Sequence, residues 1–408
     1  MANLIQRLIT EFNATEGRKK RIRITMVVLG DDAWPIFQKA QKNGEGPDLY
    51  SSGFDTYYDN PFKAGAQIFF DDLPGFTKWK RQWPSWYWIE GTTTYQGRVY
   101  AIPSQVINSR LIYNRRLFQL IGRDPDSPPR SYADLRDIAR KITALKKGWT
   151  YGFAYCGGNW ASEWMPSQWA EANGDPAYWD WKQGRWAFTG YQRVFQLLLD
   201  LQQEGSLFPN PTKLTNDALR AQFAEGRIGM FMGEVWDVGV LNDQFRAKDW
   251  AVASIPTYDG EFHGKPRAMM IGGSWSINGQ SRHRLEAWEV VQWFSRYDIR
   301  ARMYEDGKCI DPDPKVKKYI KNLPQKVNGF DAFVSTLYQE DYIATYPILP
   351  DWKKRTDTPC ALFDQILLNK GELGTKLNEL ELVWNKALDE YYLKNPQNKR
   401  GWNIYPGF

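Results

Sequence analysis

Aromatic side chains are the most unusual chemical feature of this 408-residue chain, which contains 20 Trp, 22 Tyr and 21 Phe. Aromatic rings offer large, rigid apolar faces, while the indole N–H and the phenol O–H form hydrogen bonds. Sugar rings present C–H faces that suit such surfaces. Most of these residues are expected to lie in the core, and the remainder would suit a site that stacks on a carbohydrate.

Four candidate contact residues lie shortly after strand-like segments or in their last turn. They are Asp55, Trp160, Trp236 and Trp275. Ligands of open α/β sheets bind beyond the carboxyl ends of the strands, so these side chains are candidates for one site. Core packing is the competing interpretation for each tryptophan.

Residues for catalysis or metal binding are scarce. The chain has two histidines, His263 and His283, and three cysteines, Cys156, Cys309 and Cys360, without CxxC spacing. The chain therefore has few residues from which a Ser-His-Asp triad or a histidine-based metal centre could be built. We expect no enzyme activity, no cofactor and no metal; a single disulfide stays open.

Charge and hydropathy limit the partners of the chain. The net charge of +6 is spread out, and the densest basic run, residues 18–23, precedes a strand-like segment, so no nucleic-acid partner is expected. No stretch reaches the roughly 18–20 apolar residues of a membrane span, and residues 1–13 lack the regions of an export signal. The chain as given is expected to be soluble.

Helical and strand-like segments alternate near the N-terminus. An apolar stripe predicts a helix over residues 3–13, and the β-branched run that follows predicts a strand over residues 22–29. A second helix is expected after Asp31 and Asp32, and a strand over residues 48–50. This alternation predicts an α/β protein with a parallel sheet.

The same reasoning predicts further elements along the chain. Strands are expected over residues 99–103, 111–114, 151–155 and 230–232, and helices over 132–145, 191–203, 216–225, 284–297 and 372–393. Gly226 and Gly229 are expected to permit a tight turn from helix to strand.

Several separated segments together resemble one family. They are residues 46–48 (GPD), 97–103 (GRVYAIP), 111–118 (LIYNRRLF) and 223–230 (FAEGRIGM), the last followed by Trp236. In this order and spacing the chain resembles the extracellular solute-binding proteins of ABC sugar importers, the maltose-binding-protein-like group. The resemblance covers most of the chain.

The resemblance implies a type II periplasmic-binding-protein-like fold, with two α/β lobes joined by a hinge and a ligand cleft between them. The expected lobes are residues 1–104 plus 270–312 and residues 105–269 plus 313–408. Hinge crossings are expected near 102–108, 266–271 and 309–330.

The resemblance also carries over ligand positions. Trp236 matches the family's stacking tryptophan, Asp55 matches a carboxylate that bonds sugar hydroxyls, and Gln105 and Asn108 would add polar contacts. The other candidates are Trp34, Trp160, Trp275, Asp237, Tyr346 and Trp352. Ser52 and Ile107 stand where the best-known member has an aromatic and an acid, so maltose is not the expected ligand.

The implied function is the substrate-binding component of an ABC transporter. Such a protein binds a carbohydrate, here expected to be an oligosaccharide, and delivers it to a membrane permease. It would act outside the cytoplasm, in the periplasm or as a surface lipoprotein, and as a monomer.

Two other functions stay open. One is the binding of a non-sugar ligand such as a polyamine, peptide or phosphate ester, and a polyamine site would use carboxylates such as Asp55 and Asp59 in an aromatic box. A glycoside hydrolase would use a carboxylate pair such as Glu225 with Glu234 or Asp237.

Overall fold

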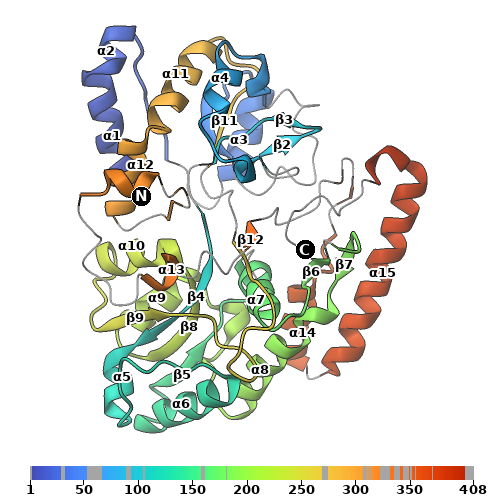
Figure 1. Cartoon of the computed structure of the whole chain (residues 1–408). Helices are drawn as coiled ribbons and strands as arrows, with labels where there is room; N and C mark the ends of the chain where they lie inside the picture. The colour runs from blue at the N-terminus through green and yellow to red at the C-terminus, as the bar shows by residue number, and fades with distance from the viewer. Residues whose placement is uncertain are drawn as a thin grey trace. The chain divides into compact units, whose positions relative to one another are not determined.

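The chain folds into two compact units (Figure 1). Unit 1 comprises Met1–Ile107, Met269–Gln325 and Ile348–Asp351, and unit 2 comprises Asn108–Ala268, Lys326–Pro347 and Trp352–Phe408. The computed structural model describes residues 2–28, 33–52, 67–88, 93–103, 106–157, 161–180, 182–268, 274–306, 310–311, 313, 315–321, 331–334, 341–342, 349, 352–353, 355–369 and 371–399. That the passages between the units act as hinges stays a prediction.

Unit 1 combines helices with two pairs of short strands. Its helices are α1 (Ala2–Ala14), α2 (Glu16–Lys20), α3 (Ala33–Lys42), α4 (Phe76–Lys80), α11 (Arg284–Phe294) and α12 (Tyr297–Glu305). Its strands are β1 (Leu49–Ser52), β2 (Thr94–Tyr95), β3 (Arg98–Val99) and β11 (Ser274–Ile277). β1 pairs antiparallel with β11, and β2 pairs antiparallel with β3. Gln96 and Gly97 form the turn between β2 and β3 with φ angles of 54° and 77°, as the two-residue hairpin requires.

The predicted N-terminal helix is present, and its apolar stripe is its buried face. Leu4, Leu8, Ile9 and Phe12 of α1 are all at most 5% exposed and pack against α11 and α12. A period of three to four residues places these side chains on one side of a helix. Burial of this face therefore fixes α1 on the rest of unit 1.

The strand predicted for residues 22–29 was wrong over its described part, residues 22–28, which form no strand. Ile22, Ile24 and Met26 do lie partly buried against the core, so the alternation that suggested a strand is real. The side chain of Asn13 takes the place of a neighbouring strand: its Oδ1 accepts from Ile24 N–H at 2.8 Å and its Nδ2 donates to Ile24 C=O at 2.9 Å. Val27 is 76% exposed. One side chain can pair the backbone N–H and C=O of a single residue, whereas a β-ladder needs a second strand alongside. Residues 22–28 therefore form no strand.

A buried charge network fixes Asp311 and Asp313 in unit 1. The Arg300 guanidinium and the Asp311 carboxylate are each 3% exposed and form two hydrogen bonds of 2.6 Å. Arg300 also donates to the Tyr87 hydroxyl at 2.6 Å and lies over the Trp83 ring. Burial raises the pKa of Tyr87 well above its usual range, so its phenol stays neutral.

Unit 2 contains the larger sheet and most of the helices. Its strands are β4 (Ser109–Asn114), β5 (Tyr151–Ala154), β6 (Tyr178–Asp180), β7 (Arg185–Ala187), β8 (Ile228–Glu234), β9 (Trp250–Ala253), β10 (Arg267–Ala268) and β12 (Asp341–Tyr342). Its helices are α5 (Arg115–Leu120), α6 (Tyr132–Leu145), α7 (Ala161–Ala172), α8 (Gln192–Gln203), α9 (Asn216–Ala224), α10 (Val235–Asp243), α13 (Asp331–Val334), α14 (Pro359–Asn369) and α15 (Leu373–Lys394). The helices predicted at 132–145, 191–203, 216–225 and 372–393 are thus confirmed, and the helix predicted at 284–297 corresponds to α11 of unit 1, which ends at Phe294.

The main sheet has the strand order β5-β8-β4-β9 (Figure 1). β5 is parallel to β8, whereas β4 is antiparallel to both β8 and β9. The parallel sheet predicted from the sequence was therefore wrong for β4. The chain enters β4 within two residues of the unit boundary at Asn108. Parallel neighbours need a crossover connection, which helices α7, α8 and α9 supply between β5 and β8.

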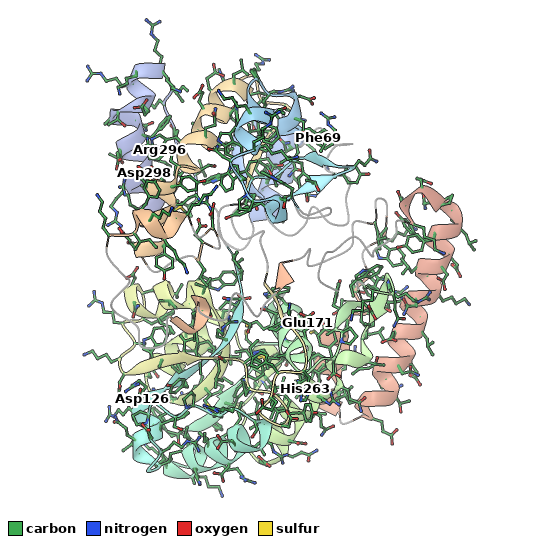
Figure 2. The ribbon with its side chains drawn as sticks, viewed as in Figure 1. Phe69, Asp126, Glu171, His263, Arg296 and Asp298 are labelled. Atoms are coloured by element: carbon green, nitrogen blue, oxygen red, sulfur yellow. The ribbon has the colours of Figure 1, made fainter. Side chains whose placement is uncertain are left out.

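Helices cover the main sheet. Ser131 caps α6 by accepting a hydrogen bond from Asp134 N–H, and the buried face of α6 packs on β5. A loop after β9 returns to α7, where His263 N–H donates to the Ala172 carbonyl at 3.0 Å (Figure 2). None of the described helices is both long and apolar enough to span a membrane.

Candidate functional site

A tryptophan and several charged side chains gather where β8 ends and α10 begins. β8 is buried along its length and ends at Glu234. Trp236 is half-buried in the first turn of α10, and Asp237 follows it. This position is the carboxyl end of β8, where the sequence predicts a ligand contact.

Glycines allow β8 to reach this position. Gly226 has a φ of 76° and makes the predicted turn before the strand. Gly229 lies inside β8 rather than in the turn, which corrects the role expected for it. A Cβ at Gly229 would lie 2.8 Å from the Gly152 carbonyl oxygen of β5. Gly229 therefore permits close approach of the two strands.

Reciprocal hydrogen bonds fix the first turn of α10. Glu234 N–H donates to Asp237 Oδ2 at 2.7 Å, and the Glu234 side chain accepts from the Asp237 N–H, which completes a capping box. Arg220 of α9 holds Asp237 from the other side, with its Nε 2.7 Å and its Nη2 2.6 Å from Oδ1. Trp236 lies within this turn, so its backbone position is well defined.

Glu234 lies in an enclosed position at the end of β8. It is 1% exposed, and its Oε1 has no hydrogen-bond partner among the described residues. Burial raises the pKa of Glu234 well above its usual range, and the nearby Asp237 carboxylate raises it further. The adjacent cavity, lined also by Met165 and Trp236, measures about 20 Å³, room for about one water molecule. Glu234 therefore favours its neutral form.

We expect the Glu234→Gln substitution to remove a pH dependence of stability. The folded-state pKa lies above the unfolded value near 4.5, so the protein loses free energy of unfolding as pH rises from about 4.5 toward the raised pKa. Glutamine is neutral throughout and should be more stable than the wild type at pH 8 but not at pH 4. Urea unfolding of both proteins at the two pH values checks this. Parallel pH profiles would contradict it.

Asn108 is fully buried in the described structure of unit 2. Its Nδ2 donates to the Phe333 carbonyl at 3.0 Å, so one of its donors supports the backbone of α13. A contact between Asn108 and a ligand stays a prediction.

Trp275 is half-buried on β11, in unit 1. Its ring lies 5.0 Å from that of Phe294, and its backbone forms hydrogen bonds with Ile102 in both directions. The residue therefore joins the core of unit 1. A ligand-stacking role for its remaining exposed surface stays a prediction.

Trp352 belongs to an aromatic cluster of unit 2. It is 7% exposed, with its ring 6.0 Å from that of Trp186 and 5.5 Å from that of Tyr391. Trp384 packs on Trp186 from another side at 4.9 Å. The described contacts of Trp352 are thus those of a core residue, and its ligand role stays a prediction.

The remaining candidates lie outside what the structure describes. Asp55, Trp160, Gln105 and Tyr346 are outside the described residues, and Trp34 is placed only as a backbone position in α3. The structure therefore brings together Trp236 and Asp237 of the predicted set. It adds Arg220, which no spacing pattern in the sequence connects with Asp237, 17 residues further on.

Comparisons with known proteins agree with this architecture. The family model described as bacterial extracellular solute-binding protein matches residues 7–326. Among curated proteins, none matches the chain in sequence.

Solved structures resemble the chain over almost its whole length. An ABC transporter solute-binding protein from Thermotoga lettingae, bound with α-D-tagatose, has a TM-score of 0.73 at 21% identity and covers 92% of this chain and 94% of its own. The ABC substrate-binding protein Lmo0181 from Listeria monocytogenes, in complex with cycloalternan, has 0.72 at 16%, with 95% and 96% covered. The sugar-binding protein MalE from Xanthomonas citri has 0.71 at 14%, with 97% of both chains covered. The predicted type II periplasmic-binding-protein-like fold is confirmed.

Proposed function

The chain belongs to the bacterial extracellular solute-binding proteins, and from that membership we propose that it binds a neutral carbohydrate as the substrate-binding component of an ABC transporter. The position of Trp236 carries the proposal. A half-buried indole at the end of a buried strand offers a flat apolar face on a rigid support, and sugar rings stack on such faces. The solved relatives bound with tagatose and cycloalternan support this ligand class.

The charges around Trp236 favour a neutral ligand. The Asp237 carboxylate is paired with Arg220 and shielded from solvent at 4% exposure. Glu234 favours its neutral form because burial raises its pKa. A polyamine needs accessible ionised carboxylates, and the described residues next to Trp236 offer none that is not already engaged. A neutral sugar needs only an aromatic face to stack on and groups that form hydrogen bonds with its hydroxyls.

The geometry also argues against a hydrolytic pair. Glu225 caps the end of α9 before β8, whereas Glu234 lies nine residues later, at the far end of the seven-residue strand β8. A strand of this length spans about 20 Å, well beyond the roughly 5–9.5 Å between the carboxylates of glycosidases. Glu234 and Asp237 are close together, but both serve the N-terminus of α10. We therefore propose binding without turnover.

The remaining parts of the proposal rest on the family. We propose that further contacts come from Asp55, Gln105, Asn108, Trp160 and Trp275, with Trp34, Tyr346 and Trp352 as additional candidates. The protein would act outside the cytoplasm as a monomer and deliver its sugar to a membrane permease.

Titration of intrinsic tryptophan fluorescence tests the proposed function. The full chain is titrated with maltohexaose, xylohexaose, cellohexaose, raffinose and D-tagatose, and with spermidine and a tetrapeptide as charged and peptide probes. We expect a saturable change with one glycan class and an affinity that varies little with salt, because a neutral ligand has no charge to screen. Chromatography of the mixture after long incubation should show intact glycan.

Each other outcome would contradict the proposal in a different way. Salt-sensitive saturation with spermidine would indicate a polyamine binder, and saturation with the peptide alone would indicate a peptide binder. Cleavage products would indicate a hydrolase. No saturable change with any glycan would overturn the carbohydrate assignment.

A further inference from the structure

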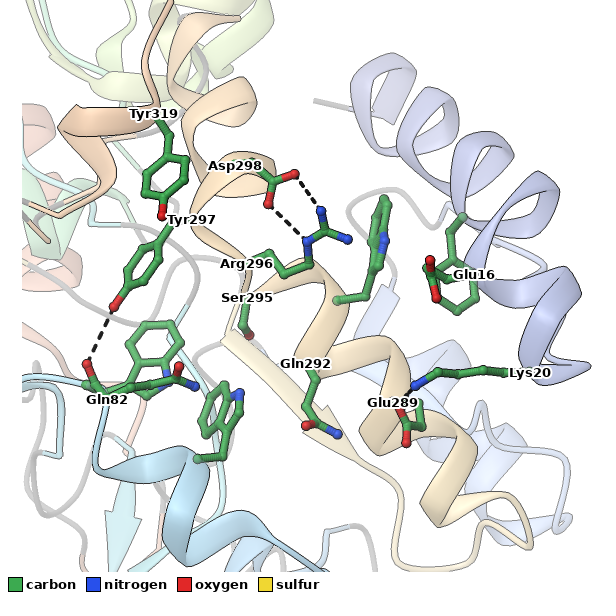
Figure 3. Close-up of a pocket in the computed structure, with 14 residues that line it drawn as sticks. Glu16, Lys20, Gln82, Glu289, Gln292, Ser295, Arg296, Tyr297, Asp298 and Tyr319 are labelled. Carbon is green, nitrogen blue, oxygen red and sulfur yellow. Dashed lines mark hydrogen bonds and ion pairs between the residues drawn. The ribbon is translucent and has the colours of Figure 1, made fainter.

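A groove on unit 1 has the size of a small-molecule site. It measures about 500 Å³, within the range of roughly 300–1,000 Å³ that ligand pockets occupy. Its walls come from α1 and α2, from α4 and the segment that follows it, from α11, α12 and the turn between them, and from the 3-10 turn Val316–Tyr319 (Figure 3). Every lining residue belongs to unit 1, so the groove shares no residue with the Trp236 site of unit 2.

Aromatic rings line the groove on two sides. Trp79 is half-buried, with its ring 5.0 Å from that of the buried Trp83. Tyr297 and Tyr319 stack nearly parallel, with ring centroids 5.6 Å apart and planes 17° apart. Tyr319 belongs to the short 3-10 turn Val316–Tyr319 and is 48% exposed. These rings are held by one another, so they offer preformed apolar faces.

Three polar side chains of the groove form no hydrogen bond with the described residues. Gln292 is half-buried, and the described part of the chain holds no hydrogen-bond partner for its side-chain amide. The side chains of Gln82 and Ser295 likewise form no hydrogen bond with a described residue, although the Gln82 carbonyl accepts from the Tyr297 hydroxyl at 3.5 Å (Figure 3). An amide both donates and accepts, which suits the vicinal hydroxyl groups of a sugar.

The charges of the groove are already compensated within its walls. Arg296 and Asp298 form a bidentate pair of 3.0 and 2.8 Å (Figures 2 and 3). Lys20 forms an ion pair with Glu289, and Glu16 pairs with Lys19 at 3.1 Å. A charged ligand would have to compete with these pairs, whereas a neutral ligand would not.

We propose that this groove is a second binding site, specific for a neutral oligosaccharide. Tyr319 and Trp79 provide the ring faces, and Gln292 reads the hydroxyl groups. The site is assembled entirely from unit 1 and does not depend on sugar binding at Trp236.

Affinity electrophoresis separates this site from the one at Trp236. The full chain carrying Trp236→Ala is run in native gels that contain soluble starch, xylan or glucomannan, and in a gel without polysaccharide. We expect at least one polysaccharide to retard this protein. Adding Tyr319→Ala or Gln292→Ala should weaken that retardation about two- to tenfold, the effect of one stacking or hydrogen-bonding group. Both residues are at least partly exposed, so the folded state should survive, which melting curves check.

A matched control uses another exposed tyrosine. Tyr258 is 40% exposed in unit 2, and Tyr258→Ala should leave the retardation unchanged. The proposal is overturned if no polysaccharide retards the Trp236→Ala protein, or if Tyr319→Ala and Gln292→Ala migrate like their parent. Failure of the proposed function would give a different result. In the fluorescence titration, the wild-type protein would then show no saturable sugar binding that Trp236→Ala abolishes.

Discussion

Replacing Trp236 with alanine is expected to weaken carbohydrate binding at least about tenfold, or roughly 1.4 kcal/mol. The substitution removes the one half-buried indole that the described structure places at the carboxyl end of β8. The capping hydrogen bonds of α10 come from Glu234 and Asp237 and do not involve the Trp236 side chain. Affinity should therefore fall while the fold persists. Isothermal titration calorimetry with the glycan identified by fluorescence measures the change.

Trp149 provides a matched control for Trp236. It is a partly exposed tryptophan of the same unit, 44% exposed, and its ring packs under Arg227 and Lys146. It precedes β5, and Tyr151 at the start of β5 pairs with Ile228 at the start of β8. Trp149 is thus at the opposite end of the strands from Trp236. Trp149→Ala should keep wild-type affinity, and Trp236→Phe should keep part of it. An unchanged dissociation constant for Trp236→Ala would remove Trp236 from the site.

The helices could be predicted from the sequence because their patterns are local. The apolar stripe of α1 and the capped start of α6 at Ser131 lie within one segment each. The prediction of a strand at residues 22–29 was wrong because a strand also needs a neighbouring strand. Here the Asn13 side chain forms the hydrogen bonds of the Ile24 backbone instead. The direction of β4 depended likewise on where the chain enters unit 2.

The site could likewise be predicted only in part, because local patterns do not show contacts between distant segments. Trp236 and Asp237 follow directly on a recognisable strand, so sequence position places them. Arg220 reaches Asp237 from another helix, and the raised pKa of Glu234 depends on burial that no single segment encodes. Trp352 illustrates the converse, because an isolated tryptophan gives no indication that Trp186 and Tyr391 enclose it.

The largest expected loss of stability follows from removing the Asp311 carboxylate. Asp311→Ala would leave the Arg300 guanidinium, 3% exposed, without its bidentate partner. Asp313 lies 3.7 Å away and is too distant to replace the two 2.6 Å hydrogen bonds. Breaking one side of a buried pair costs about 3–5 kcal/mol, and the Asp313 carboxylate would compensate the remaining Arg300 charge only in part. Calorimetric or urea unfolding should show a loss of this size.

A second aspartate tests whether burial or pairing alone causes the loss of stability expected for Asp311→Ala. Asp298 forms an equally bidentate pair with Arg296, but their side chains are 45% and 50% exposed. Exposed pairs contribute at most about 1 kcal/mol, so Asp298→Ala should destabilise far less than Asp311→Ala. Asp311→Asn keeps the shape of the side chain and part of its hydrogen bonding, so its loss of free energy of unfolding should lie between those of the two alanine variants. Equal losses for Asp298→Ala and Asp311→Ala would show that burial of the Arg300 network does not set its contribution.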